Sequence, residues 1–144
     1  MEPLVVPASL ENLEVIRKHV QEAAAAAGLG KKESYRLALA VDEVATNIIT
    51  HGYSEAGRHG SVGVEARVDA ERLTVTLDDT GAAFDPTTAS APDLDTPVEE
   101  RKAGGMGLYL AIRGVDEFLY KRVGDQNRNI FIMKRKQPSP GGSS

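Results

Sequence analysis

Cysteine is absent from this sequence, so disulfide bridges, thiolate metal sites and cysteine nucleophiles are all excluded. Aromatic residues are few, with four Tyr, three Phe and no Trp, which leaves little material for stacking nucleic-acid bases. The formal net charge is -4, whereas general nucleic-acid binders usually carry a clustered basic face. No apolar run approaches the roughly 20 residues of a membrane-spanning helix, and the first residues (MEPLVVPASL) lack the basic region of a secretory signal. We therefore expect a cytoplasmic protein that binds neither nucleic acid nor membrane directly.

The composition that is present is that of an ordinary globular protein. Of the 144 residues, 41% are hydrophobic and 26% are charged. A single domain of this length buries roughly 70% of the surface of its unfolded chain. We expect that domain to occupy residues 1–136. The Pro-, Gly- and Ser-rich end, residues 137–144, is predicted to be a disordered tail.

The spacing of apolar residues changes along the chain and predicts the order of helices and strands. The expected elements are a strand at 3–7, a helix ending near Gly28, a helix from about Lys31 to about Gly52, a hairpin of strands 62–68 and 73–77, a helix after the glycines at 104–107, and two strands at about 116–123 and 129–135 around a turn at 124–127. This order predicts an α+β fold. We expect a two-layer sandwich with helices on one face of a mixed, mostly antiparallel sheet.

Glu43 and Asn47 form the first candidate site. They lie four residues apart on the second predicted helix and therefore project together beside its apolar stripe. Taken alone, they can be a solvated glutamate and a helix-end asparagine. In a functional interpretation, Asn47 is a ligand for a hard cation and Glu43 is a general base, because magnesium takes few protein oxygens and keeps its waters or substrate phosphates. His51, a further four residues along, is predicted to be a structural histidine at the helix end.

Asp79 is the second candidate, at the exit of the hairpin's last strand. It has the same parity as Leu73, Val75 and Leu77, so its carboxylate is predicted to lie on the buried face and to need a hydrogen-bond donor. The donor can come from an Asx-type turn ahead of Gly81. Alternatively it is the amino group of a ligand, which Gly81 would let the backbone approach closely.

The third candidate is the segment Gly104-Gly105-Met106-Gly107 at the start of a predicted helix. Glycines there leave backbone N–H groups free to bind an anion, and Lys102 just before them adds positive charge. A simple turn from loop to helix would also suit glycine. The three candidates in this order together describe a nucleotide site.

With these segments in register, the sequence resembles the GHKL ATPase superfamily and, within it, the stand-alone anti-sigma factor serine/threonine kinases. The resemblance covers about residues 3–135. It rests on Glu43-x-x-x-Asn47-x-x-x-His51-Gly52-Tyr53, Asp79-x-Gly81-x-x-Phe84-Asp85-Pro86 and Gly104-Gly105-x-Gly107-Leu108. It implies a Bergerat-type, histidine-kinase-like ATPase fold in which residues 86–104 form a lid over ATP.

The resemblance also implies roles for individual residues, with ATP and Mg²⁺ as cofactors. Glu43 would be the general base and Asn47 would coordinate magnesium. Asp79 would read the adenine amino group, with Gly81 permitting the close approach. The remaining nucleotide-binding residues that it implies are Phe84, Lys102, Gly104, Gly105, Met106, Gly107 and Leu108.

By the same resemblance, the protein would be an anti-sigma regulatory factor that phosphorylates a serine or threonine of a small anti-sigma-factor antagonist protein. Its other partner would be a sigma factor or another signalling protein. The resemblance is also compatible with a homodimer. Arg17 occupies the place of a first-helix arginine that contacts such partners, although an exposed helix arginine is more often only solvated. The alternative is a nucleotide-dependent binding switch for a phosphatase or signalling partner, without significant phosphoryl transfer. Glu43 argues for chemistry, since a switch needs no base there.

Overall fold

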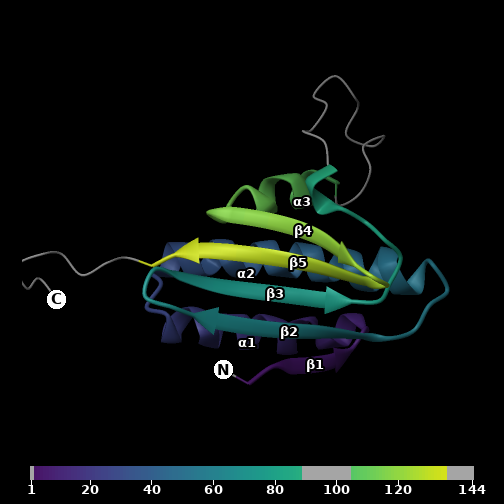
Figure 1. Cartoon of the computed structure of the whole chain (residues 1–144), viewed down its shortest axis with the longest axis horizontal. Helices are drawn as coiled ribbons and strands as arrows, with labels where there is room; N and C mark the ends of the chain where they lie inside the picture. Colours follow the sequence, from purple (N-terminus) through teal and green to yellow (C-terminus); the bar gives the residue numbers. More distant parts are fainter. Residues whose placement is uncertain (1, 89–104, 136–144) are drawn as a thin grey trace, which may run out of the picture.

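The computed structural model describes residues 2–88 and 105–135 (Figure 1). Its elements are β1 (Leu4–Pro7), the 3₁₀ turn η1 (Leu10–Asn12), α1 (Leu13–Ala26), α2 (Lys31–Asn47), the π-helix η2 (Ile48–Ser54), β2 (Ser61–Val68), β3 (Arg72–Asp79), the 3₁₀ turn η3 (Pro86–Thr88), α3 (Gly105–Ile112), β4 (Glu117–Val123) and β5 (Gln126–Lys134). Most of the predicted lid, and the predicted tail at 137–144, lie outside the described residues. None of the helices within the described ranges is long and apolar enough to cross a membrane.

The strands form one sheet in the order β1-β2-β3-β5-β4, and every neighbouring pair in it is antiparallel. The helices α1 and α2 lie side by side over one face of the sheet (Figure 1), and α3 packs against α2. The predicted α+β two-layer sandwich is confirmed. The described part of the sheet is wholly antiparallel rather than mixed.

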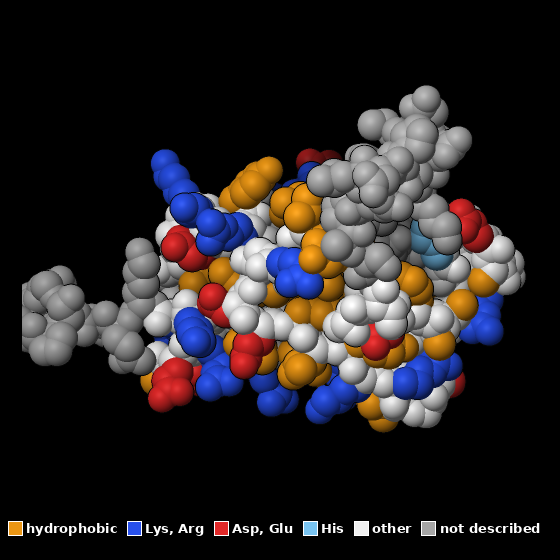
Figure 2. All heavy atoms as spheres, turned by 90° about the horizontal axis from the view of Figure 1, so that it is seen from above, with side chains coloured by type: hydrophobic (Ala, Val, Ile, Leu, Met, Phe, Trp, Pro, Cys, Tyr) orange, Lys and Arg blue, Asp and Glu red, His pale blue; other side chains and the backbone are white. Residues whose placement is uncertain are grey.

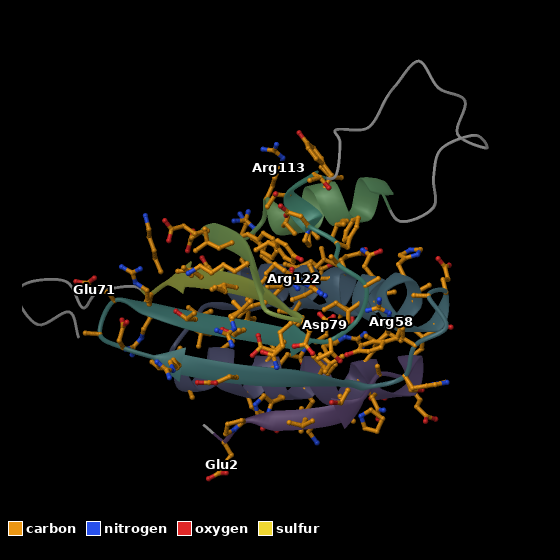
Figure 3. The ribbon with its side chains drawn as sticks, turned by 45° about the vertical axis from the view of Figure 1, so that its right-hand side comes forward. Glu2, Arg58, Glu71, Asp79, Arg113 and Arg122 are labelled. Carbon is orange, nitrogen blue, oxygen red and sulfur yellow. The ribbon has the colours of Figure 1, made fainter. Side chains whose placement is uncertain are left out.

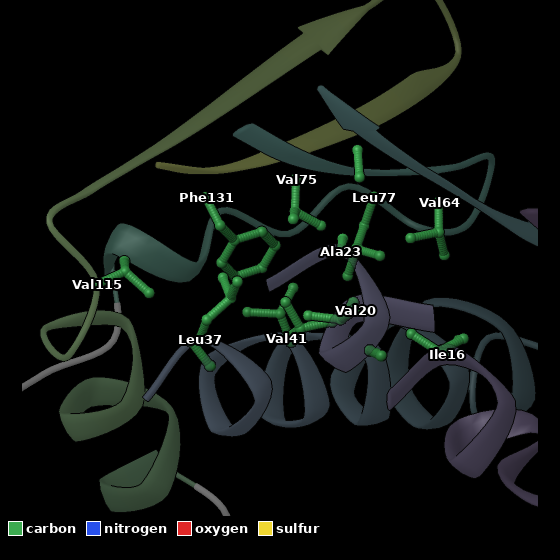
Figure 4. Close-up of a cluster of buried hydrophobic side chains, with 14 of the residues drawn as sticks. Ile16, Val20, Ala23, Leu37, Val41, Val64, Val75, Leu77, Val115 and Phe131 are labelled. Carbon is green, nitrogen blue, oxygen red and sulfur yellow. The ribbon is translucent and has the colours of Figure 1, made fainter. Parts of the chain in front are cut away.

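The core lies between the sheet and the first two helices, where both hydrophobic periodicities meet. Alternate residues of β3, such as Val75 and Leu77, point toward Leu37 and Val41 of α2, and all four are fully buried (Figure 4). Phe131 of β5 is also fully buried, and its ring meets that of Phe118 of β4 edge-on. This burial fixes the parity of β3 and therefore the face on which its last residue lies.

The second predicted helix changes character at Asn47. A single helix to about Gly52 was expected, but α2 ends at Asn47 and the chain continues as the π-helix η2. Tyr53 of η2 supplies a reason, because its hydroxyl donates to the Ser61 carbonyl at 2.8 Å and accepts from the Thr80 amide at 2.8 Å. These bonds hold the wider helical turn against the start of β2 and the exit of β3.

The last hairpin has a shorter turn than the sequence predicted. Only Gly124 and Asp125 form the turn, with Gly124 at a φ of 61° that favours glycine. Gln126 and Asn127, which were predicted to belong to the turn, are the first residues of β5. Asn127 therefore pairs with Asp79 across the sheet instead of lying at its edge.

The described surface carries charges of both signs. Lys and Arg side chains and Asp and Glu side chains are scattered over the face seen in Figure 2. On the sheet, Arg128 pairs with Asp78 at 2.8 Å, on the face opposite the helices. This placement agrees with the strand parity, which sends Asp78 outward and Asp79 inward.

Candidate functional site

The first two predicted segments meet at a pocket between the helical layer and the sheet. The end of α2 and η2 form one wall, and the ends of β3 and β5 with the chain after β3 form the others. The residues that line it are Val44, Asn47, Ile48, Gly52, Asp79, Ala82, Phe84, Pro86, Asn127 and Asn129. Among the described residues of this lining, Asp79 is the sole charged side chain. Figure 3 shows it at the end of β3, near Arg122 of β4.

Asp79 is only 4% exposed, as its parity predicted. Its Oδ1 accepts hydrogen bonds from the Gly81 amide and from Asn127 Nδ2, both at 2.9 Å. Its Oδ2 is buried and has no hydrogen-bond partner in the described part of the chain. Burial raises the pKa of Asp79, while the bonds from Asn127 and Gly81 and the charge of Arg122 oppose that rise. The predicted Asx-type bond thus uses one oxygen and leaves the other as an acceptor for a bound donor.

Two asparagines of β5 belong to the site and were not predicted. Asn127 is 3% exposed, and its Nδ2 group donates to Asp79, to the Gly81 carbonyl at 3.1 Å and to the Ala82 carbonyl at 3.3 Å. Asn129 is 1% exposed, and its Oδ1 has no partner among the described residues. The signal for Asn129 was present in the sequence, because this residue shares the parity of Phe131 within the predicted strand, whereas Asn127 fell in the predicted turn.

Gly81 lies directly against η2. A Cβ atom at this position would come within 2.8 Å of the Gly52 carbonyl oxygen. The amide of Ala82 also donates to that oxygen, at 2.9 Å. The contact with η2 is therefore one physical reason for glycine here. The close approach of a ligand, which the sequence predicted for Gly81, stays a prediction.

The first and third segments also come together. Glu43 lies half-buried on α2, and a Cβ atom added at Gly107 would be 3.0 Å from its Oε2 and 3.1 Å from its Oε1. The first turn of α3 therefore packs on the Glu43 carboxylate. Burial, and to a lesser degree the neighbouring charge of Asp42, raise the pKa of Glu43. At the end of the same helix, Asn47 donates its amide to the Glu43 carbonyl at 3.1 Å, a bond that does not use the amide oxygen.

The other predicted nucleotide-binding residues fall in different places. Phe84 is 45% exposed at the edge of the pocket, whereas Leu108 is buried in the core and could face a ligand only through its backbone. Gly105 and Met106 open α3. Lys102 and Gly104 lie outside the described residues.

Two side chains near the site have partners at the surface. Arg17 of α1 pairs with Asp42 of α2 at 2.8 Å, so it is neither only solvated nor free. His51 Nδ1 lies 2.6 Å from Glu55 Oε1 on the exposed side of η2, which fits the structural role predicted for this histidine.

The profile of the histidine kinase-like ATPase domain family matches residues 6–135. The chain belongs to this family. It is 28% identical over 142 residues to the serine-protein kinase RsbW of Staphylococcus aureus strains bovine RF122 / ET3-1 and JH9, an alignment that covers 95% of this chain and 89% of each relative. The histidine kinase domain of the Erythrobacter litoralis EL346 blue-light activated histidine kinase superposes with a TM-score of 0.49 at 20% identity, over 89% of this chain and 61% of that one. The resemblance to the GHKL kinases is confirmed.

Membership of the histidine kinase-like ATPase family implies the use of ATP, and the pocket residues fit that ligand. The unpartnered oxygens of Asp79 and Asn129 are acceptors of the kind that an amino group on a base requires. Asn47 offers one amide oxygen, which suits a magnesium ion held mainly by phosphates and water. Within residues 2–88 and 105–135, no three His, Asp or Glu side chains gather into a metal-binding cluster.

Proposed function

We propose that this protein is an ATP-binding regulator that transfers the γ-phosphoryl group to a serine or threonine of a partner protein. The acceptor would be a small anti-sigma-factor antagonist, and a sigma factor or another signalling protein would be the second partner. The observation that carries the proposal is the position of Glu43, whose half-buried carboxylate lies against the first turn of α3. The relatives named serine-protein kinases support it.

The sheet side of the pocket would hold the base. Asp79 Oδ2 accepts a hydrogen bond from the adenine amino group, which gives the buried carboxylate the donor that it lacks. Val44, Ile48 and Pro86 provide apolar contacts for the ring. Such a pocket, mostly apolar with a few polar groups that fix orientation, is typical of a small-molecule site.

The helical side would hold the phosphates. The N–H groups in the first turn of α3 are free of intrahelical bonds, and the positive end of the helix dipole favours an anion there. Asn47 would hold Mg²⁺, and the ion when bound neutralises charge on the phosphates. Phosphoryl transfer needs mostly positioning and charge stabilisation, so these groups are sufficient together with a base.

Glu43 would take the proton of the acceptor hydroxyl. Because its pKa is raised by burial, it is a stronger base than a fully solvated glutamate. Gly107 brings no side chain between this carboxylate and the site.

The substitution Glu43→Gln tests this role. It keeps the size of the side chain and removes its basicity, so we expect the rate of phosphoryl transfer to fall by roughly 10²–10⁴-fold. The affinity for ATP and magnesium, measured by calorimetry, should stay close to that of the wild type. A variant that phosphorylates the partner at the wild-type rate would show that Glu43 is not the base.

The partner can be found with the protein itself as bait. The full chain is incubated with lysate of its source cell in the presence of ATP and then of ADP, and captured proteins are examined by mass spectrometry for phosphate on serine or threonine. A sigma factor captured together with a small, newly phosphorylated protein supports the proposal. Nucleotide-dependent capture of a phosphatase or receptor without phosphate gain would instead support the binding switch.

A further inference from the structure

The orientation of the Asn127 carboxamide is fixed from both ends. Its Oδ1 accepts hydrogen bonds from Arg122 Nη1 at 2.9 Å and from the Tyr120 hydroxyl, both on β4. Its Nδ2 group faces Asp79 Oδ1 and the carbonyls of Gly81 and Ala82. A reversed amide would set its oxygen against three acceptors and its NH₂ group against two donors. Asn127 can therefore only donate toward Asp79.

This donor in turn fixes the Asp79 carboxylate. Oδ1 holds two hydrogen bonds, from Asn127 and Gly81, and the carboxylate cannot rotate without breaking both. Oδ2 is consequently the oxygen left for a ligand in the pocket. The Asp79 carboxylate accepts both hydrogen bonds, and they favour its ionised form over its protonated form.

The charged groups that act on Asp79 come from the sheet. Arg122 on β4 favours its ionised form, and Asp78 on β3 opposes it. Asp78 is paired with Arg128 of β5 on the other face. The pocket walls from α2 and η2 are uncharged and consist of Val44, Asn47, Ile48 and Gly52.

We propose that Asn127 is the positioning residue that makes this pocket select a 6-amino purine over a 6-oxo purine, a role that rests on the proposed nucleotide site. An ionised carboxylate oxygen only accepts hydrogen bonds, so it matches an amino group and repels a carbonyl oxygen. Without the Asn127 amide, Asp79 is free to turn and to take up a proton. A carboxylic acid can donate to a 6-oxo group, and the selection is then lost.

The test compares ATP with inosine triphosphate, a 6-oxo purine nucleotide, on the full chain with magnesium. For Asn127→Ala we expect the affinity for ATP to fall by roughly tenfold or more, since a hydrogen bond to a charged group is lost. The affinity for inosine triphosphate should change much less, so the ratio of the two affinities falls. ATP binding to the variant should also weaken more steeply than binding to the wild type as the pH is lowered from 8 to 6. A merely structural role would weaken both nucleotides equally at every pH.

Arg128→Ala is the matched control, because Arg128 is the next residue of β5 and its side chain lies on the opposite face, against Asp78. It should leave the ratio unchanged. Tyr120→Phe removes one of the two donors that orient Asn127 and keeps the ring, so it should lower the ratio by less. This milder variant keeps the inference testable if Asn127→Ala does not fold.

The outcomes separate the two proposals. Equal weakening of both nucleotides by Asn127→Ala, or an equal loss of selectivity in Arg128→Ala, would overturn the role of Asn127 and leave the nucleotide site standing. A wild-type protein that binds neither nucleotide would overturn the proposed function itself.

Discussion

The Asp79 carboxyl group is buried, and burial disfavours its ionised form. Because burial raises its pKa, the folded protein binds the Asp79 proton more tightly than the unfolded chain does. The free energy of unfolding therefore falls as the pH rises above the ordinary aspartate pKa of about 3.9. Each pKa unit of this difference corresponds to about 1.4 kcal/mol. A residue kept at such a cost to stability is typical of a functional site.

The substitution Asp79→Asn should accordingly raise the stability of the protein and lower its affinity for ATP. Without nucleotide at pH 7, we expect the variant to have a higher melting temperature than the wild type, by a few degrees for each kcal/mol gained. The gap should close below about pH 4, where the wild-type carboxyl is neutral in both states. Its affinity for ATP should fall, because an NH₂ group replaces the free acceptor. Thermal unfolding at both pH values and calorimetry with ATP provide the measurements.

Asp78→Asn is the matched control, since that carboxylate is paired with Arg128 on the outer face. It should give no gain in stability at pH 7. An Asp79→Asn variant that melts below the wild type at pH 7 would contradict the account of the buried charge.

Some individual residues of the site could be predicted from the sequence and others could not. The burial of Asp79 followed from the alternation of Leu73, Val75 and Leu77, a purely local pattern. Asn127 was missed because Gly, Asp and Asn all favour turns, so nothing local marked Gln126 as the start of the strand. Its role depends on hydrogen bonds to β3 and β4, which no local pattern reveals.

At the scale of the elements, the end of α2 and the start of α3 hold the residues of the proposed phosphoryl transfer. α2 was predicted correctly in type, but its change to a π-helix depends on the bonds of Tyr53 to Ser61 and Thr80. Those partners are 8 and 27 residues away, beyond what helical periodicity can report. The packing of Gly107 on Glu43 is likewise a contact between two helices far apart in the chain.

The substitution Gly107→Ala tests that packing. The new methyl group would lie 3.0 Å from Glu43 Oε2, so the flexible carboxylate must move by a few tenths of an ångström or more. We expect the protein to stay folded, because alanine is the better helix former and the displaced group is a side-chain end. The rate of phosphoryl transfer should fall by roughly tenfold or more, since small misplacements of catalytic groups are costly.

Gly63→Ala on β2 is a suitable control, because its methyl group would meet nothing closer than 3.9 Å. It should leave both the melting temperature and the transfer rate close to those of the wild type. If Gly107→Ala transfers phosphate at the wild-type rate, the packing of α3 on Glu43 does not position this carboxylate for the reaction.

At the scale of the whole molecule, the site joins the two layers of the fold. Of the residues of the proposed nucleotide site, Asp79, Asn127 and Asn129 come from the sheet, and Glu43, Asn47 and Gly107 come from the helices. The fold class was predictable because the 3.6- and 2-residue periods are local signals. The placement of β5 between β3 and β4 was not predictable in the same way, since it depends on pairing between distant segments.

A ligand that bridges both layers should stabilise the whole chain. At an ATP concentration a hundred times its dissociation constant, the expected gain is about 2.7 kcal/mol. For a chain of this size that corresponds to a rise in melting temperature of roughly 5–10 °C. Differential scanning fluorimetry with ATP and magnesium measures the shift, and chelation of the metal should reduce it. Identical melting curves with and without ATP would contradict nucleotide binding altogether.

The division of the site between sheet and helices makes the protein a favourable starting point for engineering. The proposed recognition groups on β3 and β5 can be redesigned while Glu43, the proposed base on α2, is left unchanged. A redesigned pair at positions 79 and 127 could accept a synthetic nucleotide that natural kinases ignore. Such an orthogonal enzyme would tag its own targets in a crowded cell extract.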